Sequence, residues 1–308
     1  MERIAVIDLG TNTFNILIVD VAPDKTYQQV FQNKISVKLA EGGINKGFIA
    51  PVPFQRGIDA MKEHKIVAEK YDVLKIHAFA TSAIRGASNG NDFVERIREE
   101  TGIVVNVITG DREAELIYYG VRRAAAMTDK NSLIIDIGGG STEFIIGTKD
   151  HIVWKQSFML GAARLLEMFQ LSDPIKPQEI SILENYLREE LKPLFTAVEK
   201  YGVDELIGSS GSFDSLAEMI AWKYYTPEIL HGKTEYTFNL GDCEALYNII
   251  IASSNEERLQ MKGLVAMRVD MIVVSSIIVN FVIRNFHISK MRLSTYSLKE
   301  GVLHEILK

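Results

Sequence analysis

The sequence predicts an α/β protein with two related lobes. Apolar runs rich in Ile and Val alternate with amphipathic runs along the 308 residues, as is typical of α/β folds. One pattern also occurs twice. Residues 4–20 (IAVIDLGTNTFNILIVD) and 132–147 (SLIIDIGGGSTEFIIG) each hold a strand-like run, an Asp, a turn of Gly and hydroxyl residues, and a second strand-like run. We therefore expect two units, residues 1–127 and 128–308, divided at the polar connector 128–131, with room for the last helix to pack back on the first unit.

The two turns have the composition of an anion-binding site. Glycine lets the backbone approach a ligand closely, and successive N–H groups in such a turn can hold an anion. The carboxylates of Asp8 and Asp136 would repel phosphate unless a cation lay between them, which points to Mg²⁺. One such turn alone would fit an ordinary hairpin equally well. Two copies with the same order of Asp, Gly and hydroxyl favour a site for a polyanion between the lobes.

The first lobe continues with alternating elements after its hairpin. Apolar periodicity, polar turns and Gly102 as a helix-ending residue predict a strand over 27–39, a helix over 53–71, a strand over 75–81, a loop over 81–91, a helix over 92–100, a strand over 103–109 and a helix over 111–127.

The second lobe repeats this alternation. After its hairpin the pattern predicts a strand over 153–160, a helix over 161–169, a loop over 171–178, one long helix over 178–200, a strand from 205 ending in a Gly/Ser turn at 208–212 that opens a helix, helices over 241–253 and 255–286, a strand over 291–294 and a helix from 299.

Three further segments follow predicted strands. Arg85 lies where ligands bind in open α/β sheets, and its planar guanidinium matches phosphate oxygens, although a solvated surface Arg has the same sequence signal. Residues 110–115, GDREAE, begin a helix, where acids also complement the helix dipole. The turn 208–212, GSSGS, fits a third phosphate or nucleotide site, but also a simple strand-to-helix connection.

Composition limits the class of protein. The net charge of −6 argues against broad nucleic-acid binding, and the single cysteine, Cys243, rules out an internal disulfide framework. The six histidines show no metal-ligand spacing. No secretory signal is visible, and the longest apolar stretch, 271–283, is short for a membrane span. We expect a cytoplasmic protein without membrane contact, in which that stretch serves either the core or a homodimer.

Six segments together resemble the exopolyphosphatase / guanosine pentaphosphate phosphohydrolase (Ppx/GppA) family of the actin-like ATPase superfamily. They occur in the family's order and read AVIDLGTNTF, FATSAIRGASN, VITGDREAELIYYGV, LIIDIGGGSTEFIIG, IGSSGSFDSLAEM and RLSTYSLKEGVL. The resemblance implies two ribonuclease-H-like domains with an active cleft between them. It also implies Mg²⁺-dependent release of the terminal phosphate from inorganic polyphosphate, or of the 5′ γ-phosphate from pppGpp.

The resemblance assigns roles to individual residues. The family's catalytic glutamate falls on Glu113. The metal ligands expected are Asp136, Glu143 and Asp8, and the phosphate-binding residues expected are Gly10, Thr11, Asn12, Arg85, Gly138, Gly139, Gly140, Ser141, Thr142, Gly208, Ser209, Ser210 and Gly211.

The chain departs from the family pattern at three positions. Arg112 replaces a glutamate, which adds either a phosphate contact or a surface charge. Near the domain closure, Ser297 replaces a glycine and Lys299 replaces an arginine. Longer members carry further C-terminal domains, so for this chain we expect distributive action on short polyphosphates. The alternatives are a pppGpp phosphohydrolase and, from another class, a non-hydrolytic nucleotide-sensing module.

Overall fold

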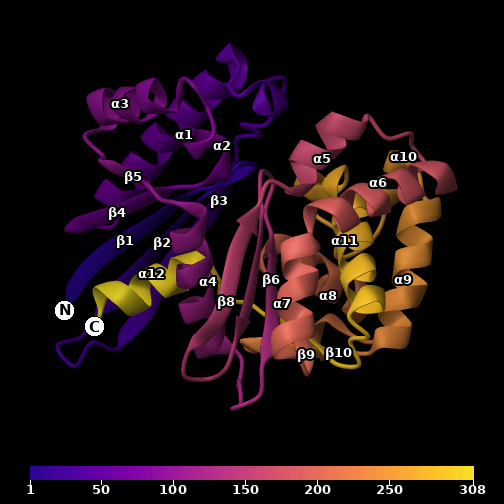
Figure 1. Cartoon of the computed structure of the whole chain (residues 1–308). Helices are drawn as coiled ribbons and strands as arrows, with labels where there is room; N and C mark the ends of the chain where they lie inside the picture. The colour runs from indigo at the N-terminus through magenta and orange to yellow at the C-terminus, as the bar shows by residue number, and fades with distance from the viewer.

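Two mixed sheets organise the chain in the computed structural model, which describes residues 1–308 (Figure 1). The first sheet has the strand order β3-β2-β1-β4-β5. Its first three strands form an antiparallel meander, and β4 and β5 continue on the other side of β1 in parallel. The bounds are β1 Glu2–Leu9, β2 Thr13–Val21, β3 Tyr27–Ser36, β4 Lys75–Ala80 and β5 Val105–Val107.

The second sheet repeats this arrangement. Its order is β10-β11-β9-β6-β7-β8, with an antiparallel meander β6-β7-β8 and the parallel neighbours β9 and β11 on the other side of β6. The bounds are β6 Ser132–Ile137, β7 Thr142–Gly147, β8 Ile152–Phe158, β9 Glu205–Ser209, β10 Glu235–Phe238 and β11 Met291–Ser294. The α/β prediction and the duplication inferred from the two turns are therefore confirmed.

Helices cover both sheets. Those of the first half are α1 Pro51–Lys70, α2 Ser82–Arg85, α3 Gly90–Thr101 and α4 Gly110–Ala124, with a 3₁₀ turn η1 at Ile44–Lys46. Those of the second half are α5 Ala162–Phe169, α6 Pro177–Glu190, α7 Lys192–Tyr201, α8 Ser210–Tyr224, α9 Leu240–Ala252, α10 Asn255–Leu259, α11 Met271–Asn285 and α12 Leu298–Ile306, with 3₁₀ turns η2 Pro227–Leu230 and η3 Ala266–Arg268.

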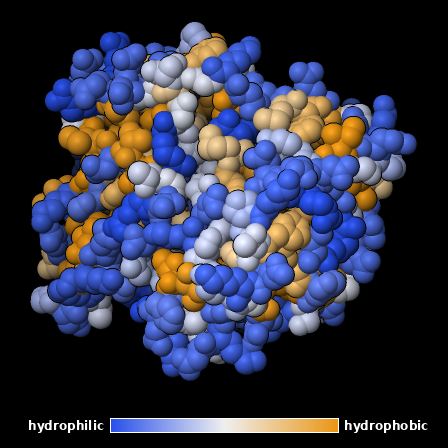
Figure 2. Space-filling model, in the orientation of Figure 1, coloured by the Kyte–Doolittle hydropathy of each residue, from blue (hydrophilic) through white to orange (hydrophobic).

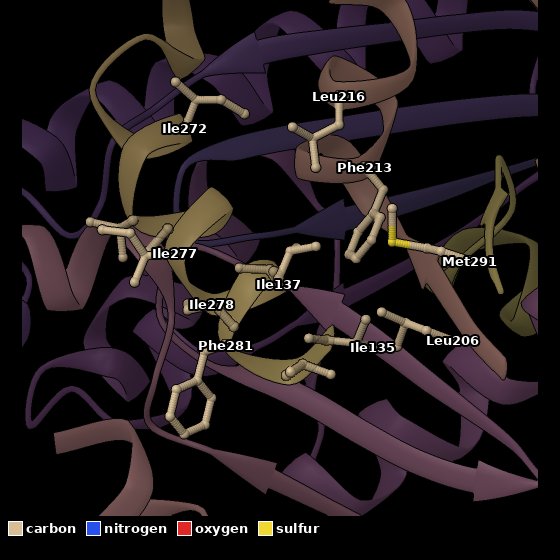
Figure 3. Packing of buried hydrophobic residues seen from close by; sticks show 14 of the residues in the cluster. Ile135, Ile137, Leu206, Phe213, Leu216, Ile272, Ile277, Ile278, Phe281 and Met291 are labelled. Atoms are coloured by element: carbon tan, nitrogen blue, oxygen red, sulfur yellow. The ribbon is translucent and has the colours of Figure 1, made fainter. Parts of the chain in front are cut away.

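The apolar stretch 271–283 belongs to the core of this chain. It forms most of α11, whose residues Ile272, Ile277, Ile278 and Phe281 are at most 1% exposed. They belong to the same buried cluster as side chains of β6, β9 and α8 (Figure 3). The stretch therefore gives no support to a homodimer. No helix in the structure combines the length and apolar character needed to cross a bilayer. Hydrophilic residues predominate on the face drawn in Figure 2.

Four sequence-based expectations were wrong in detail. The expected helix over 178–200 is two helices that meet at Leu191, because Pro193 cannot donate a backbone hydrogen bond in the first turn of α7. The expected helix over 255–286 breaks at Gly263, whose φ of +84° and contact with the backbone of Glu218 suit only glycine. The expected loop over 81–91 contains the short helix α2, and strand β10 was not predicted.

The last helix returns to the first half of the chain. Helix α12 crosses α4, and Figure 1 shows it beside the N-terminal strands, with the two chain ends close together. A Cβ on Gly120 would lie 2.0 Å from the carbonyl oxygen of Ser297, and one on Gly301 would lie 1.8 Å from that of Leu116. Glycine at both positions therefore lets the helices approach this closely. The expected unit boundary at 127/128 falls between α4 and β6. Helix α12 belongs to the second unit in sequence but packs on α4 of the first.

Candidate active site

The two predicted turns adopt the same geometry. The amide of Gly10 donates to the carbonyl of Thr13 over 3.1 Å, and the amide of Gly138 donates to the carbonyl of Ser141 over 3.0 Å. A Cβ at Gly10 or Gly138 would lie 2.9 or 3.0 Å from that same carbonyl oxygen. Glycine is therefore needed at both positions because the turn closes onto its Cα atom, and the similarity seen in the sequence reflects a shared backbone structure.

The turns face each other across one cavity. A Cβ on Gly140 would lie 2.6 Å from Oγ1 of Thr11 and 2.7 Å from Oγ of Ser82, so the two lobes touch at this point. The cavity between them has a volume of about 120 Å³ and is lined mainly by polar groups. Its lining includes Asp8, Gly10, Thr11, Asn12, Glu113, Asp136, Gly138, Gly139, Gly140, Ser141, Glu143, Ser210 and Gly211.

The three expected metal ligands line this cavity from strands β1, β6 and β7. Asp136 pairs with Glu143 across β6 and β7, and Asp8 stands at the corresponding place in β1. Burial raises the pKa of Asp8 and of Asp136 to about 6 each. Burial, together with the neighbouring Asp136, raises the pKa of Glu143 to about 7. These three carboxylates therefore lie close together in a buried place where their negative charges are destabilised.

Hydrogen bonds hold these carboxylates in place. The hydroxyl of Ser209 donates to Asp136 over 2.8 Å, and that of Ser157 donates to Glu143 over 2.6 Å. The amide of Asn15 lies 3.3 Å from Asp8. Each bond favours the ionised form of its acceptor, but burial has the larger effect on all three.

Glu113 lies in the first turn of α4 and points into the same cavity. Only 7% of this residue is exposed. Burial and the charge of Glu143 raise the pKa of Glu113 well above its usual range, and Arg85 opposes this effect. Nη1 of Arg85 donates to Oε2 of Glu113 over 2.8 Å and to the carbonyl of Ile108 over 3.0 Å. Carboxylates that act as general bases are commonly buried and have a raised pKa, as Glu113 does.

The donor set fits Mg²⁺ bound together with phosphate. No three Asp, Glu, His or Cys side chains come close enough to hold a metal ion by themselves. Mg²⁺ is commonly bound by one or two carboxylates, with phosphate oxygens and waters completing its coordination. Buried carboxylates with raised pKa values at one cavity are the groups that such an ion would stabilise.

Four expected phosphate-binding residues do not line the cavity. Arg85 contacts Glu113 instead, and Ser209 contacts Asp136. Thr142 donates its hydroxyl to the carbonyl of Leu160 over 2.9 Å, because side chains alternate along β7 and its neighbour Glu143 faces the cavity. A Cβ on Gly208 would lie within 2.0 Å of the Phe213 ring, so this glycine serves packing.

The sequence did not single out Arg268, which lines the cavity from η3. Its guanidinium covers Gly211, where a Cβ would lie 1.4 Å from Nη2. Only glycine at position 211 leaves room for this guanidinium. Nη1 of Arg268 lies 3.2 Å from the hydroxyl of Ser215, and Arg268 forms no ion pair. An isolated Arg before an apolar run gave no local signal of this placement.

Of the three positions that depart from the family pattern, only Ser297 lines the cavity. Arg112 forms ion pairs with Glu115 and with Glu305 of α12, so its charge joins two helices. Lys299 is 9% exposed, lies 3.8 Å from the Glu300 carboxylate, and its charge lowers the pKa of Asp8. Neither side chain lines the cavity.

Known proteins resemble this chain along almost its whole length. The chain is 28% identical over 302 residues to exopolyphosphatase 1 of Mycobacterium bovis, which covers 98% of this chain and 87% of that protein. A crystal structure of an exopolyphosphatase from Cytophaga hutchinsonii has 41% identity and a TM-score of 0.94, covering 99% of this chain and 98% of the other.

A crystal structure of the Aquifex aeolicus member of the Ppx/GppA family has 26% identity and a TM-score of 0.80, again covering 99% and 98%. The model of the Ppx/GppA phosphatase family matches residues 17–308. Because this model matches nearly the whole sequence, the chain belongs to the Ppx/GppA phosphatase family.

Proposed function

We propose that this protein is a Mg²⁺-dependent exopolyphosphatase that releases the terminal phosphate from inorganic polyphosphate. The observation that carries the proposal is the position of Glu113, a buried carboxylate of raised pKa that faces two glycine turns across one cavity. The proteins similar to this chain that bear the name exopolyphosphatase support the same substrate class.

The proposed reaction needs one proton transfer. A water oxygen attacks the terminal phosphorus, the phosphoanhydride bond breaks, and the products are orthophosphate and a chain one unit shorter. Glu113 orients this water and accepts its proton. Its raised pKa makes it a stronger base than an exposed glutamate, while Arg85 keeps enough of it ionised to act.

The remaining groups bind and position the substrate. Backbone N–H groups of the turns at Gly10 and Gly138 and the hydroxyls of Thr11 and Ser141 offer neutral donors to phosphate oxygens. Asp8, Asp136 and Glu143 would hold Mg²⁺, which neutralises negative charge on the phosphates. Arg268, the one guanidinium in the cavity lining, adds a positive charge. Phosphoryl transfer depends mostly on such positioning and charge neutralisation.

Two other functions remain as alternatives. The same groups suit the 5′ triphosphate end of pppGpp, because the terminal phosphates of both substrates are chemically alike. A non-hydrolytic nucleotide sensor would have no use for a carboxylate at the place of Glu113. The phosphatase family of the chain also favours hydrolysis.

One experiment tests the proposal. Phosphate release is measured in parallel from long polyphosphate, tripolyphosphate and pppGpp, with Mg²⁺ and with excess chelator. We expect Mg²⁺-dependent release from inorganic polyphosphate with a higher kcat/KM than from pppGpp. A higher kcat/KM for pppGpp would assign the second activity, and no release from any of the three would support the sensor.

A further inference from the structure

A second cavity lies further along α11, toward its C-terminal end, than the candidate active site. It occupies about 220 Å³ between α8, α9, α11 and β11. Ile220, Val279 and Met291 form its floor and are each at most 4% exposed. Leu216, another wall residue, is labelled in Figure 3 together with Phe213 and Met291 of the same core cluster. The exposed residues Gly241, Glu244 and Arg284 form the mouth, so the cavity opens to solvent.

One polar atom in this cavity has no partner. The hydroxyl of Ser276 is buried, with 3% of the residue exposed, and makes no hydrogen bond. Leaving a buried hydroxyl unpaired costs roughly 1–3 kcal/mol. Tyr247 and Asn280, which also line the cavity, do not bond to it. A ligand with one hydrogen-bonding group would satisfy Ser276.

The charges around the mouth restrict the ligand. Arg284 already pairs with Glu184, and Glu244 adds a further negative charge at the rim. The thiol of Cys243 in the wall is neutral because burial raises its pKa to about 12. An anion such as phosphate would therefore find no free cation here. The apolar walls and the volume suit an uncharged ring or branched group, since a cavity of roughly 150 Å³ already admits benzene.

The helices that form this cavity also line the candidate active site. Ser210, Gly211 and Ser212 of α8 face the active cavity, whereas Leu216 of the same helix faces the second one. On α11, Ser275 faces the active cavity and its neighbour Ser276 faces the second. The hydroxyl of Ser212 donates to that of Ser275 over 2.9 Å. Because this hydrogen bond joins α8 to α11 in the active cavity, a change in the distance between the two helices would alter it.

We propose that this second cavity is an effector site for a small, uncharged, mostly apolar molecule with one hydrogen-bonding group. Its occupant fixes the spacing of α8 and α11 and thereby changes phosphate hydrolysis. The effect on hydrolysis rests on the proposed phosphohydrolase activity, whereas binding in the cavity does not.

Binding is tested by NMR on the full chain with ¹³C-methyl methionine. The probes are phenol, toluene, which lacks the hydroxyl, and benzoate, which carries a charge. We expect phenol and toluene to shift the methyl signal of Met291 saturably and to leave that of Met61, buried in the first lobe, unchanged. Benzoate binds at least tenfold more weakly. Absence of a saturable shift of Met291 with phenol up to its solubility overturns the proposal.

Three variants locate the site. Cys243→Phe fills the cavity and is expected to weaken phenol binding at least tenfold, while Ala245→Phe, on the exposed side of the same helix, leaves it unchanged. Ser276→Ala is expected to weaken phenol about fivefold and toluene not at all. Equal phenol affinity in Cys243→Phe and wild type overturns the proposal. Ser276→Ala and the benzoate comparison still test it if Cys243→Phe does not fold.

Kinetics test the effector role. Saturating phenol is expected to change kcat or KM for tripolyphosphate at least twofold in wild type and in Ala245→Phe, but not in Cys243→Phe. Binding that leaves both constants unchanged overturns the effector role. A protein that releases no phosphate from any polyphosphate, with or without phenol, instead shows that the proposed function itself has failed.

Discussion

Nη1 of Arg85 lies 2.8 Å from Oε2 of Glu113, which joins two residues that the sequence assigned to different tasks. Arg85 was expected to bind phosphate and Glu113 to act as base. The structure places the guanidinium against the carboxylate, so Arg85 acts on the pKa of Glu113.

Glu113→Gln is expected to lower kcat by roughly 10²–10⁴-fold, because the amide cannot accept the proton of water. Substrate affinity should change little, since glutamine has nearly the same shape. Phosphate release and equilibrium binding of tripolyphosphate are measured on the same preparation, with the unfolding temperature as the control for folding. A kcat near that of wild type would remove Glu113 from the proposed mechanism.

Arg85→Ala is expected to move the acid limb of the kcat/KM profile to higher pH. The cation now favours the ionised form of Glu113, so its removal raises the pKa of Glu113, and more alkali is needed to ionise the base. Arg85→Lys should restore part of the shift, because it keeps the charge without the planar fork. A profile that only drops in height, with unchanged limbs, would show that Arg85 acts on substrate binding instead.

Asp136→Asn is expected to raise the Mg²⁺ concentration needed for half-maximal activity. The substitution removes a charged oxygen ligand and keeps the hydrogen bond from Ser209 available. Activity is titrated against Mg²⁺ at saturating tripolyphosphate, with Asp150→Asn, the same change at an exposed position outside the cavity, as the control. An unchanged midpoint would place the metal elsewhere, with Asp8 the next candidate.

The protein is expected to shorten long polyphosphate distributively. The cavity holds about 120 Å³, and the net charge of −6 offers a long anion little attraction beyond it. A long chain therefore gains few contacts over a short one and dissociates between cleavages. Gel electrophoresis of partly digested polymer should show a ladder of gradually shortening chains. Full-length polymer beside end products alone would indicate processive action.

His64 is expected to lower the stability of the folded protein in mild acid. It is fully buried, its Nε2 lies 3.2 Å from the carbonyl of Phe14, and its Nδ1 has no partner. Burial lowers its pKa to about 4 from 6.5, so the unfolded chain binds the proton more tightly. The free energy of unfolding is therefore unaffected by protonation of His64 above pH 6.5 and decreases as the pH falls from 6.5 toward 4.

Urea unfolding at pH 7.0 and 4.5 measures this loss. Between the two values, wild type should lose roughly 2 kcal/mol more than His64→Leu, which cannot titrate at this position. Replacement of the exposed His231 by Gln serves as the control and should behave like wild type. Equal losses in wild type and His64→Leu would show that His64 does not cause the acid sensitivity.

The sequence by itself determined the α/β alternation, the duplicated turn and most members of the cavity. These features follow local rules. Gly10 and Gly138 are required by closure of their own turns, Asp8 and Asp136 lie just before those turns, and Glu113 starts a helix after a strand. Pattern and spacing carry such information because the interacting groups are close in the chain.

Only the tertiary structure decided which side chains meet across long distances. The contact of Arg85 with Glu113, the cover of Gly211 by Arg268 and the crossing of α4 and α12 at Gly120 and Gly301 join segments far apart in the chain. Local spacing does not specify them, because they depend on how packed elements are placed relative to one another. Thr142 shows the same limit within one strand, since alternation sends its hydroxyl to Leu160 while Glu143 faces the cavity.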